Sequence, residues 1–154
     1  MKTTFRTGIY IARPPKTVTQ VFLDPANAVL WTTGLARFEV VSGRPGEVGS
    51  IARLHYLQDN QPYVMQDVLL AAEPDRRYVS RVSGEALTAE IETSLSPSRG
   101  GTELSIRWTG TGKRLMLRLL LPFLRGNLVR QAQADLKKLK DLVEEGPATG
   151  SPPG

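Results

Sequence analysis

The alternation of apolar and polar residues at the start of the chain predicts a strand followed by two short helices. Residues Thr3–Ile11 alternate and are rich in β-forming side chains, as expected for a strand with one buried face. Two prolines at 14–15 stop this strand and suit the first turn of a helix, where no hydrogen-bonded N–H is lost. We therefore expect a short helix over residues 17–23 and a second over 26–31, with Asp24 as the N-cap of the second.

From residue 38 onward the pattern is one of strands joined by short turns. Each apolar run is followed by a turn rich in Gly, Pro, Asp, Asn or Ser, and even spacing with short turns is typical of an antiparallel meander. The predicted strands cover residues 38–41, 50–57, 63–72, 78–82, 87–95 and 102–109.

The last element has a different period. Apolar residues recur at helical spacing from Leu117 to Val143, while lysines and arginines occupy the opposite face. Pro122 should kink this helix or break it near its start. The final segment is rich in Pro, Gly and Ser, so we expect one domain over residues 1–145 and a disordered tail over 146–154.

The turn positions also predict the register of the hairpins. A two-residue loop at 59–60 gives the pairs Tyr56–Tyr63, Leu54–Met65 and Ala52–Asp67. Two-residue loops at 74–75 and 84–85 and a four-residue loop at 98–101 add the pairs Leu69–Ser80, Ala71–Tyr78, Val82–Leu87, Ser80–Ala89, Tyr78–Ile91, Leu95–Leu104, Thr93–Ile106 and Ile91–Trp108. All four hairpins then agree on which side of the sheet is apolar, and a one-residue slip would break that agreement.

The predicted inner face is mostly aliphatic and aromatic, with Asp67, Ser80 and Thr93 as polar exceptions. Aromatic rings with polar tips, a methionine and isolated polar groups are typical of a ligand pocket, although the long helix filling this face completely is the competing interpretation. The candidate ligand-binding residues are Trp31, Leu54, Tyr56, Tyr63, Met65, Asp67, Tyr78, Ser80, Leu87, Ile91, Ile106, Trp108 and Leu121.

Composition excludes several kinds of chemistry. The chain has no cysteine, which excludes disulfides, thiolate metal sites and cysteine nucleophiles. His55 is the only histidine, and the register places it outward beside Arg53, as a surface residue; this speaks against catalytic zinc. No Gly-x-Ser-x-Gly elbow is present, and the glycines at 110–113 lack the spacing of a phosphate loop and are expected to connect a strand to a helix. We expect no metal and no cofactor.

The net charge of +5 comes from one segment. Residues 113–140 hold eight basic residues and one acidic residue, whereas the rest of the chain is slightly acidic. Such a segment can bind an anionic partner such as nucleic acid or a membrane surface, and the competing interpretation is the solvated face of a helix. The apolar run 115–124, flanked by Arg114 and Arg125, can enter a membrane interface or form a dimer contact, but we favour core or cavity wall. We expect no nucleic-acid partner and at most a weak membrane-surface contact.

The start of the chain lacks the apolar run of a signal peptide. No stretch reaches the ~18 apolar residues of a membrane-spanning helix. Together with the absence of cysteine, this predicts a cytoplasmic protein.

Several local sequences carry a family resemblance. Residues 11–18 (IARPPKTV) followed by 22–25 (FLDP) are similar to a pattern I-x-x-P-P-x-x-V…L-x-D-P, with Trp31 where a tryptophan is often found. GEVGS at 46–50 and EPDRRY at 73–78 add to the match. In this order, over roughly residues 3–143, they resemble the START-like, Bet v 1-like (SRPBCC) superfamily, also called the polyketide cyclase/dehydrase and lipid transport group. The resemblance implies an α+β helix-grip fold, in which a curved antiparallel sheet wraps around a long C-terminal helix.

The resemblance also implies binding of hydrophobic ligands such as lipids, sterols or polyketides, and less often cyclase or hydrolase activity. It implies no catalytic residue, because the superfamily has no universal catalytic motif. Our first hypothesis is a carrier or sensor for an apolar or amphipathic small molecule, oriented by hydrogen bonds from Tyr56, Tyr63, Tyr78 and Asp67.

Two other hypotheses stay open. In the second, the protein is a polyketide cyclase/dehydratase-like enzyme with Asp67 as acid or base, because a carboxylate facing an apolar cavity should have a raised pKa. A structural role for Asp67, through a hydrogen bond to Ser80, Tyr56 or Tyr63, is the competing interpretation. In the third, the basic C-terminal helix is a membrane-surface or protein-interaction module.

Overall fold

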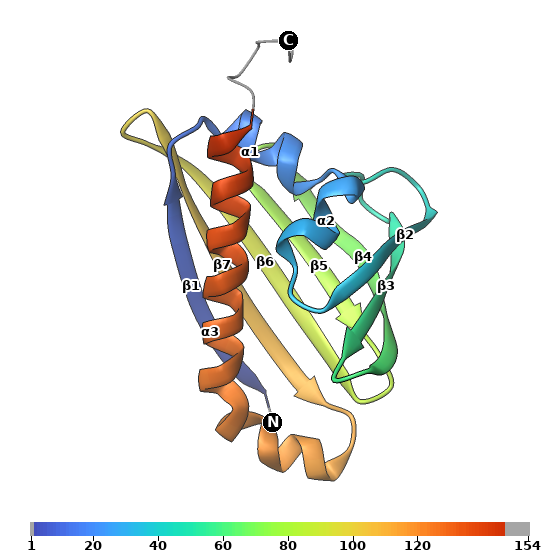
Figure 1. The fold of residues 1–154 in the computed structure, drawn as a ribbon. Helices are drawn as coiled ribbons and strands as arrows, with labels where there is room; N and C mark the ends of the chain where they lie inside the picture. Colours follow the sequence, from blue (N-terminus) through green and yellow to red (C-terminus); the bar gives the residue numbers. More distant parts are fainter. Residues whose placement is uncertain (1, 147–154) are drawn as a thin grey trace.

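Residues 2–146, the part of the chain that the computed structural model describes, form a seven-stranded antiparallel sheet and three helices (Figure 1). The elements in chain order are β1 (Thr3–Ile11), α1 (Pro15–Phe22), α2 (Pro25–Trp31), β2 (Leu35–Ser42), β3 (Ile51–Gln58), β4 (Gln61–Glu73), β5 (Arg77–Ser83), β6 (Leu87–Ser98), β7 (Gly101–Gly112) and α3 (Leu115–Glu145). The strand order is β1-β7-β6-β5-β4-β3-β2, so the first and last strands pair with each other. The sheet curves around α3, which confirms the α+β helix-grip fold (Figure 1).

The two short helices begin at their prolines. Pro15 and Pro25 occupy the first turns of α1 and α2, one or two residues before the predicted starts. Asp24 caps α2 as predicted, because its carboxylate accepts a hydrogen bond from the Ala26 N–H at 3.0 Å. Most of the predicted tail lies outside the described residues.

The register of two hairpins is confirmed. The β3–β4 pairs Tyr56–Tyr63, Leu54–Met65 and Ala52–Asp67 are all present. Asp59 and Asn60 have φ values of 51° and 63°, the left-handed conformation that a two-residue type I′ turn requires. The β6–β7 pairs are also as predicted. The loop has two residues, Arg99 and Gly100, instead of the predicted four, because Ser98 and Gly101 form one further pair.

The β4–β5 hairpin differs from the prediction at Ala71. Ala71 pairs with Val79, and Tyr78 pairs with Ala72. The loop has three residues, and a register shift between Leu69 and Ala71 then restores the predicted pair Leu69–Ser80. A β-bulge of this kind compensates for the extra loop residue.

The predicted β5–β6 register is wrong by two residues. Its true partners are Val82–Ala89, Ser80–Ile91 and Tyr78–Thr93. The loop spans residues 84–87 and is closed by a hydrogen bond from the Gly84 N–H to the Leu87 carbonyl at 2.9 Å. A slip of two residues keeps every side chain on its predicted face, because side chains alternate with a period of two.

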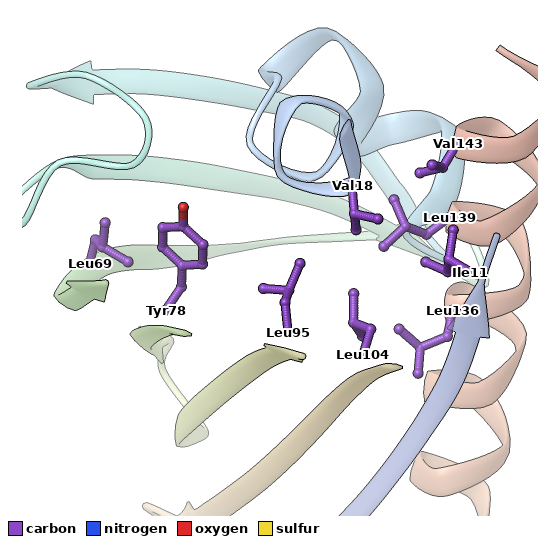
Figure 2. Close-up of a cluster of buried hydrophobic side chains, with 9 residues drawn as sticks. All are labelled: Ile11, Val18, Leu69, Tyr78, Leu95, Leu104, Leu136, Leu139 and Val143. Carbon is purple, nitrogen blue, oxygen red and sulfur yellow. The ribbon is translucent and has the colours of Figure 1, made fainter. Parts of the chain in front are cut away.

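One end of the domain is a filled core (Figure 2). The C-terminal half of α3 packs there against α1, β1 and the ends of the central strands, and Ile11 and Leu139 have no exposed surface. The competing interpretation, in which the long helix covers the inner face of the sheet completely, is therefore correct at this end of the domain. The cluster consists of Ile11, Val18, Leu69, Tyr78, Leu95, Leu104, Leu136, Leu139 and Val143.

The start of α3 departs from the rest of the helix. Pro122 lies inside α3, and Figure 1 shows the helix bending early in its course, as the proline predicts. We call residues 115–124 the N-terminal arm. Leu121 is buried in the arm, but six apolar residues are exposed, so the preferred core or cavity-wall interpretation of this run is wrong for them: Leu115, Met116, Leu119, Leu120, Phe123 and Leu124. None of the helices within residues 2–146 is long and apolar enough to cross a membrane.

Candidate ligand cavity

A cavity of about 410 Å³ lies between the sheet and the helices. Its walls come from all seven strands, from α1 and α2, and from α3 at Leu128, Gln131, Ala132 and Asp135. Pockets of roughly 300–1,000 Å³ with mostly apolar walls and a few polar groups are typical of small-molecule sites. The hollow part of the domain thus adjoins the filled core.

The predicted inner face lines this cavity. All the candidate ligand-binding residues except Leu121 belong to its walls, and so does Thr93, the third polar exception. Leu121 is only 4% exposed but lies outside the lining, because it anchors the N-terminal arm of α3. Binding of a ligand by these residues remains a prediction.

Sequence reasoning missed the wall that α3 contributes. Gln131, Ala132 and Asp135 lie three, four and seven residues after Leu128, so the four residues share one face of the helix. Asp135 lies seven residues after Leu128, which is a signal that could have placed it in the cavity. This signal is hard to recognise, because Asp135 is the single acidic residue of a basic segment that is interpreted as a solvated face.

Asp67 lies in the middle of β4, between Ala52 of β3 and Val82 of β5. Burial raises the pKa of its carboxyl to about 6, and a hydrogen bond from Ser80 on the neighbouring strand partly opposes this shift. The expected raised pKa and the competing hydrogen bond to Ser80 are therefore both present. A carboxyl in this state can accept or donate a proton close to neutral pH.

The three tyrosines of the cavity are not equivalent. The Tyr63 hydroxyl donates to the Gln58 side chain at 3.4 Å, and the Tyr78 hydroxyl accepts from the Asp75 N–H at 3.1 Å. Tyr56 stacks on Tyr63 with ring centroids 4.9 Å apart, and its hydroxyl has no partner among the described residues. Burial raises the pKa of Tyr56 far above its usual value, and Tyr63, Asp67 and Asp135 add to this effect, so the hydroxyl stays a hydrogen-bond donor.

Asp135 carries a second carboxylate into the cavity wall, opposite the sheet. It accepts hydrogen bonds from the Thr33 N–H at 3.1 Å and from the Thr33 hydroxyl, which ties α3 to the segment after α2. Burial raises its pKa, while the bonds from Thr33 and the charge of Lys138 act in the opposite direction. Asp135 thus connects α3 to the segment after α2, whereas the hydrogen bond of Asp67 to Ser80 stays within the sheet.

Four residues of the cavity lining are exposed to solvent: Val40, Pro45, Tyr63 and Gln131. They mark the rim of the cavity, with Tyr63 on β4 and Gln131 on α3. Tyr56 lies behind Tyr63, further from solvent.

Two other predictions concern residues outside the cavity. His55 lies on the outer face as predicted, where its Nε2 atom is 2.9 Å from the Glu39 carboxylate. The glycines at 110 and 112 belong to β7, not to the connection, which consists of Lys113 and Arg114 alone. A side chain at Gly112 would collide with the backbone of Leu117 and Arg118, because the arm crosses β7 there.

A curved sheet closed around a long helix, with an apolar cavity between them, defines a protein of the START-like, Bet v 1-like superfamily. More particularly, the chain belongs to the polyketide cyclase / dehydrase and lipid transport family, whose model matches residues 2–144. The resemblance inferred from the sequence is thereby confirmed. No curated protein matches the chain.

Solved structures agree on the fold. The aromatase/cyclase Zhui from Streptomyces sp. R1128 is similar with a TM-score of 0.79 at 15% identity, covering 97% of this chain and 99% of its own. Ara h 8.0201 has a TM-score of 0.76 at 17% identity, covering 95% and 100%. A START superfamily protein from Mycobacterium smegmatis has a TM-score of 0.74 at 17% identity, covering 92% and 97%. At these identities the likeness shows the fold alone.

Proposed function

We propose that this protein binds a small amphipathic molecule in the cavity, as a carrier or sensor. The observation that carries the proposal is an apolar cavity of about 410 Å³ whose inward polar groups, Tyr56 and Asp67, are not fully used by the protein itself. Buried polar groups are normally satisfied, so a ligand that hydrogen-bonds to them fits such a site better than a purely apolar one. Membership of a family described by polyketide chemistry and lipid transport supports the same class of ligand.

The arrangement of the walls suggests how the ligand lies. Aliphatic and aromatic side chains of the central strands, such as Ile91 and Trp108, would enclose its apolar body. A hydroxyl or carbonyl group on the ligand would meet the Tyr56 hydroxyl as a donor and the Asp67 carboxylate as an acceptor. The ligand class is therefore an apolar, ring- or chain-shaped molecule with at least one oxygen substituent.

Tryptophan fluorescence provides a direct test, because both tryptophans of the chain, Trp31 and Trp108, line the cavity. Native mass spectrometry of the purified protein should detect a co-purified small molecule. Titration of the emptied protein with anilinonaphthalene sulfonate should quench the tryptophan emission.

A variant that fills the cavity sharpens this test. Ala132→Phe adds a ring to the cavity wall and should weaken probe binding about tenfold or more, since it takes up ligand space. Ala134→Phe adds the same ring to an exposed position of α3 and serves as the matched control. Equal probe affinities for both variants and the parent protein would contradict binding in this cavity.

A second candidate function is catalysis by Asp67. It is favoured by the position of this carboxyl in the cavity wall, with a pKa raised by burial to about 6, which suits proton transfer. The family, described by polyketide cyclase and dehydrase chemistry, supports a reaction of that class. Asp67→Asn should then retain ligand binding and lose turnover, whereas unchanged function with the natural ligand would eliminate the enzyme hypothesis.

A further inference from the structure

The N-terminal arm of α3 presents an apolar surface to solvent that nothing in the described structure covers. Phe123 is 85% exposed and Met116 is 74% exposed, and four leucines beside them are also exposed. Single exposed apolar residues are ordinary, but six within ten residues form a contiguous patch, and such patches mark interaction sites.

Helical geometry places this patch on one side of the arm. At about 100° per residue, the six exposed apolar positions fall within one half of the helix circumference. The other half carries Arg114, Leu117, Arg118, Leu121 and Arg125. The arm is therefore amphipathic, but with its apolar half turned away from the domain.

The inward half of the arm is fixed to the end of the sheet. Its backbone lies so close to Gly112 that a side chain there would collide with it, and Leu121 is buried beneath it. The Arg125 guanidinium donates to the Thr4 carbonyl at 2.9 Å, and that of Arg118 donates to the Gly112 carbonyl at 3.4 Å. The arm is thus held on β1 and β7 at one end of the domain (Figure 1). Its six exposed apolar residues face solvent there.

The charge around the arm has one sign. Residues 113–134 contain five basic residues and no acidic one. Arg114 forms an ion pair with Glu85 of the β5–β6 loop, which leaves Lys113, Arg118, Arg125 and Arg130 without an acidic partner among the described residues. Arg118 and Arg125 remain exposed although they donate to main-chain carbonyls, and those bonds leave their positive charges without a counter-ion within residues 2–146. Exposed cations around an apolar helix face match an anionic bilayer, because the apolar face enters the acyl boundary while the cations remain among the headgroups.

We propose that the N-terminal arm of α3 is a membrane-docking helix, which lies in the plane of an anionic bilayer with Phe123 and the exposed leucines inserted. A bilayer fits this surface better than a second copy of the chain, because a symmetric contact would bring the unpaired cations of both copies together. It also fits better than a protein groove, since exposed apolar side chains need no complementary shape to enter lipid. Gln131, an exposed residue of the cavity lining, lies two helical turns further along α3 than Leu124, so docking places this part of the cavity wall near the lipid surface.

The absence of cysteine allows a site-specific test. Phe123→Cys and Val48→Cys, each labelled with nitrobenzoxadiazole, place one polarity-sensitive dye on the arm and one on the exposed β2–β3 turn as a matched control. With vesicles of phosphatidylcholine and phosphatidylglycerol in equal parts, the emission of the label at 123 should shift to the blue and that of the label at 48 should not. Vesicles of phosphatidylcholine alone, or added salt, should diminish the shift because the cations then lose their counterpart or are screened.

A second experiment makes the exposed apolar patch of the arm polar. The double variant Leu119→Ser/Phe123→Ser should reduce co-sedimentation with the anionic vesicles about tenfold or more. Leu30→Ser/Val48→Ser removes two exposed apolar residues elsewhere and should bind like the parent protein. Equal co-sedimentation of the two double variants would overturn the proposal. So would a dimer that Leu119→Ser/Phe123→Ser dissociates, combined with no label shift on anionic vesicles. Neither readout depends on what the cavity binds.

Discussion

The indole ring of Trp108 lies over the Cα atom of Gly110, two residues further along β7. A methyl group on Gly110 would overlap the six-membered ring of the indole. Phe5 stacks on the same indole from β1, with ring centroids 5.4 Å apart. The position of a principal wall of the cavity thus depends on the absence of a side chain at residue 110.

Gly110→Ala should therefore displace Trp108 and destabilise the protein by about 1–3 kcal/mol, because the added methyl overpacks a tight site. Denaturant unfolding and the tryptophan emission spectrum should both report the change. The matched control is Gly126→Ala in α3, where the new methyl meets nothing closer than 3.6 Å. In a helix this change should stabilise by about 0.5–1 kcal/mol, so effects of the same sign at both positions would contradict the packing described for Trp108.

Removal of the Tyr56 hydroxyl should act on ligand binding more than on stability. Its hydroxyl has no partner among the described residues, so Tyr56→Phe should change the free energy of unfolding by less than about 0.5 kcal/mol. Affinity for an oxygen-bearing ligand should fall about tenfold, as expected for the loss of one hydrogen bond. Tyr78→Phe gives the contrast, because it removes the acceptor of the Asp75 N–H and should cost about 1 kcal/mol of stability. A larger loss of affinity for Tyr78→Phe than for Tyr56→Phe would contradict this assignment.

Asp67 should make the stability of the protein depend on pH. Its pKa is raised from 3.8 to about 6 in the folded state, so the folded protein binds this proton more tightly than the unfolded chain does. Ionisation of Asp67 then opposes folding: the penalty is absent below the unfolded-state pKa, grows as pH rises towards the folded-state pKa, and is complete above it. Asp67→Asn should consequently stabilise the protein by about 1–3 kcal/mol near pH 8 and by almost nothing near pH 3.5.

Urea unfolding of both proteins at the two pH values checks this expectation. Glu90→Gln, on the exposed outer face of β6, should change stability by less than about 0.5 kcal/mol at either pH. A stabilisation by Asp67→Asn that is the same at both pH values would show that its cause is not the buried charge.

The filled and hollow ends of the domain should respond differently to truncation. Leu104 is 1% exposed within the filled core, so Leu104→Ala should cost about 3–5 kcal/mol. Leu54 borders the cavity on one side, where it has fewer contacts to lose, and Leu54→Ala should cost about 1–3 kcal/mol. Thermal unfolding of the two variants measures the difference, and equal losses would indicate that the cavity is collapsed in solution.

The sequence predicts the sheet best where a turn has only one conformation. Asp59 and Asn60 tolerate left-handed backbone, so the β3–β4 register can be derived from two residues. The loop before Leu87 carries no such constraint, because two- and four-residue loops put the same side chains inward. The side of the sheet on which each side chain lies is therefore predicted correctly, and with it the cavity walls, even though the predicted β5–β6 pairs are wrong.

Two features of α3 cannot be predicted from the pattern of apolar and polar residues along it. The rule that apolar residues are buried favours the core for residues 115–124, but it does not reveal that the arm crosses the end of β7 instead of lying along the sheet. Asp135 shares a helix face with Leu128, but its place in a basic segment conceals this, and its contact with Thr33 shows where that face lies in the fold. Both depend on where the helix lies relative to the sheet, which is a tertiary property.

The width of the β5–β6 turn has a consequence for how such a chain can change. Removal of two residues from segment 84–87 would leave a two-residue loop closed by the same pair, Ser83–Thr88, with every side chain on its own face. Removal of one residue would turn Thr88, Glu90 and Glu92 towards the cavity if the strands shifted by one, unless a bulge absorbed the change as it does in β4. Turn length here is thus subject to a parity rule: insertions and deletions in pairs preserve the cavity lining, and odd ones preserve it only with a compensating bulge.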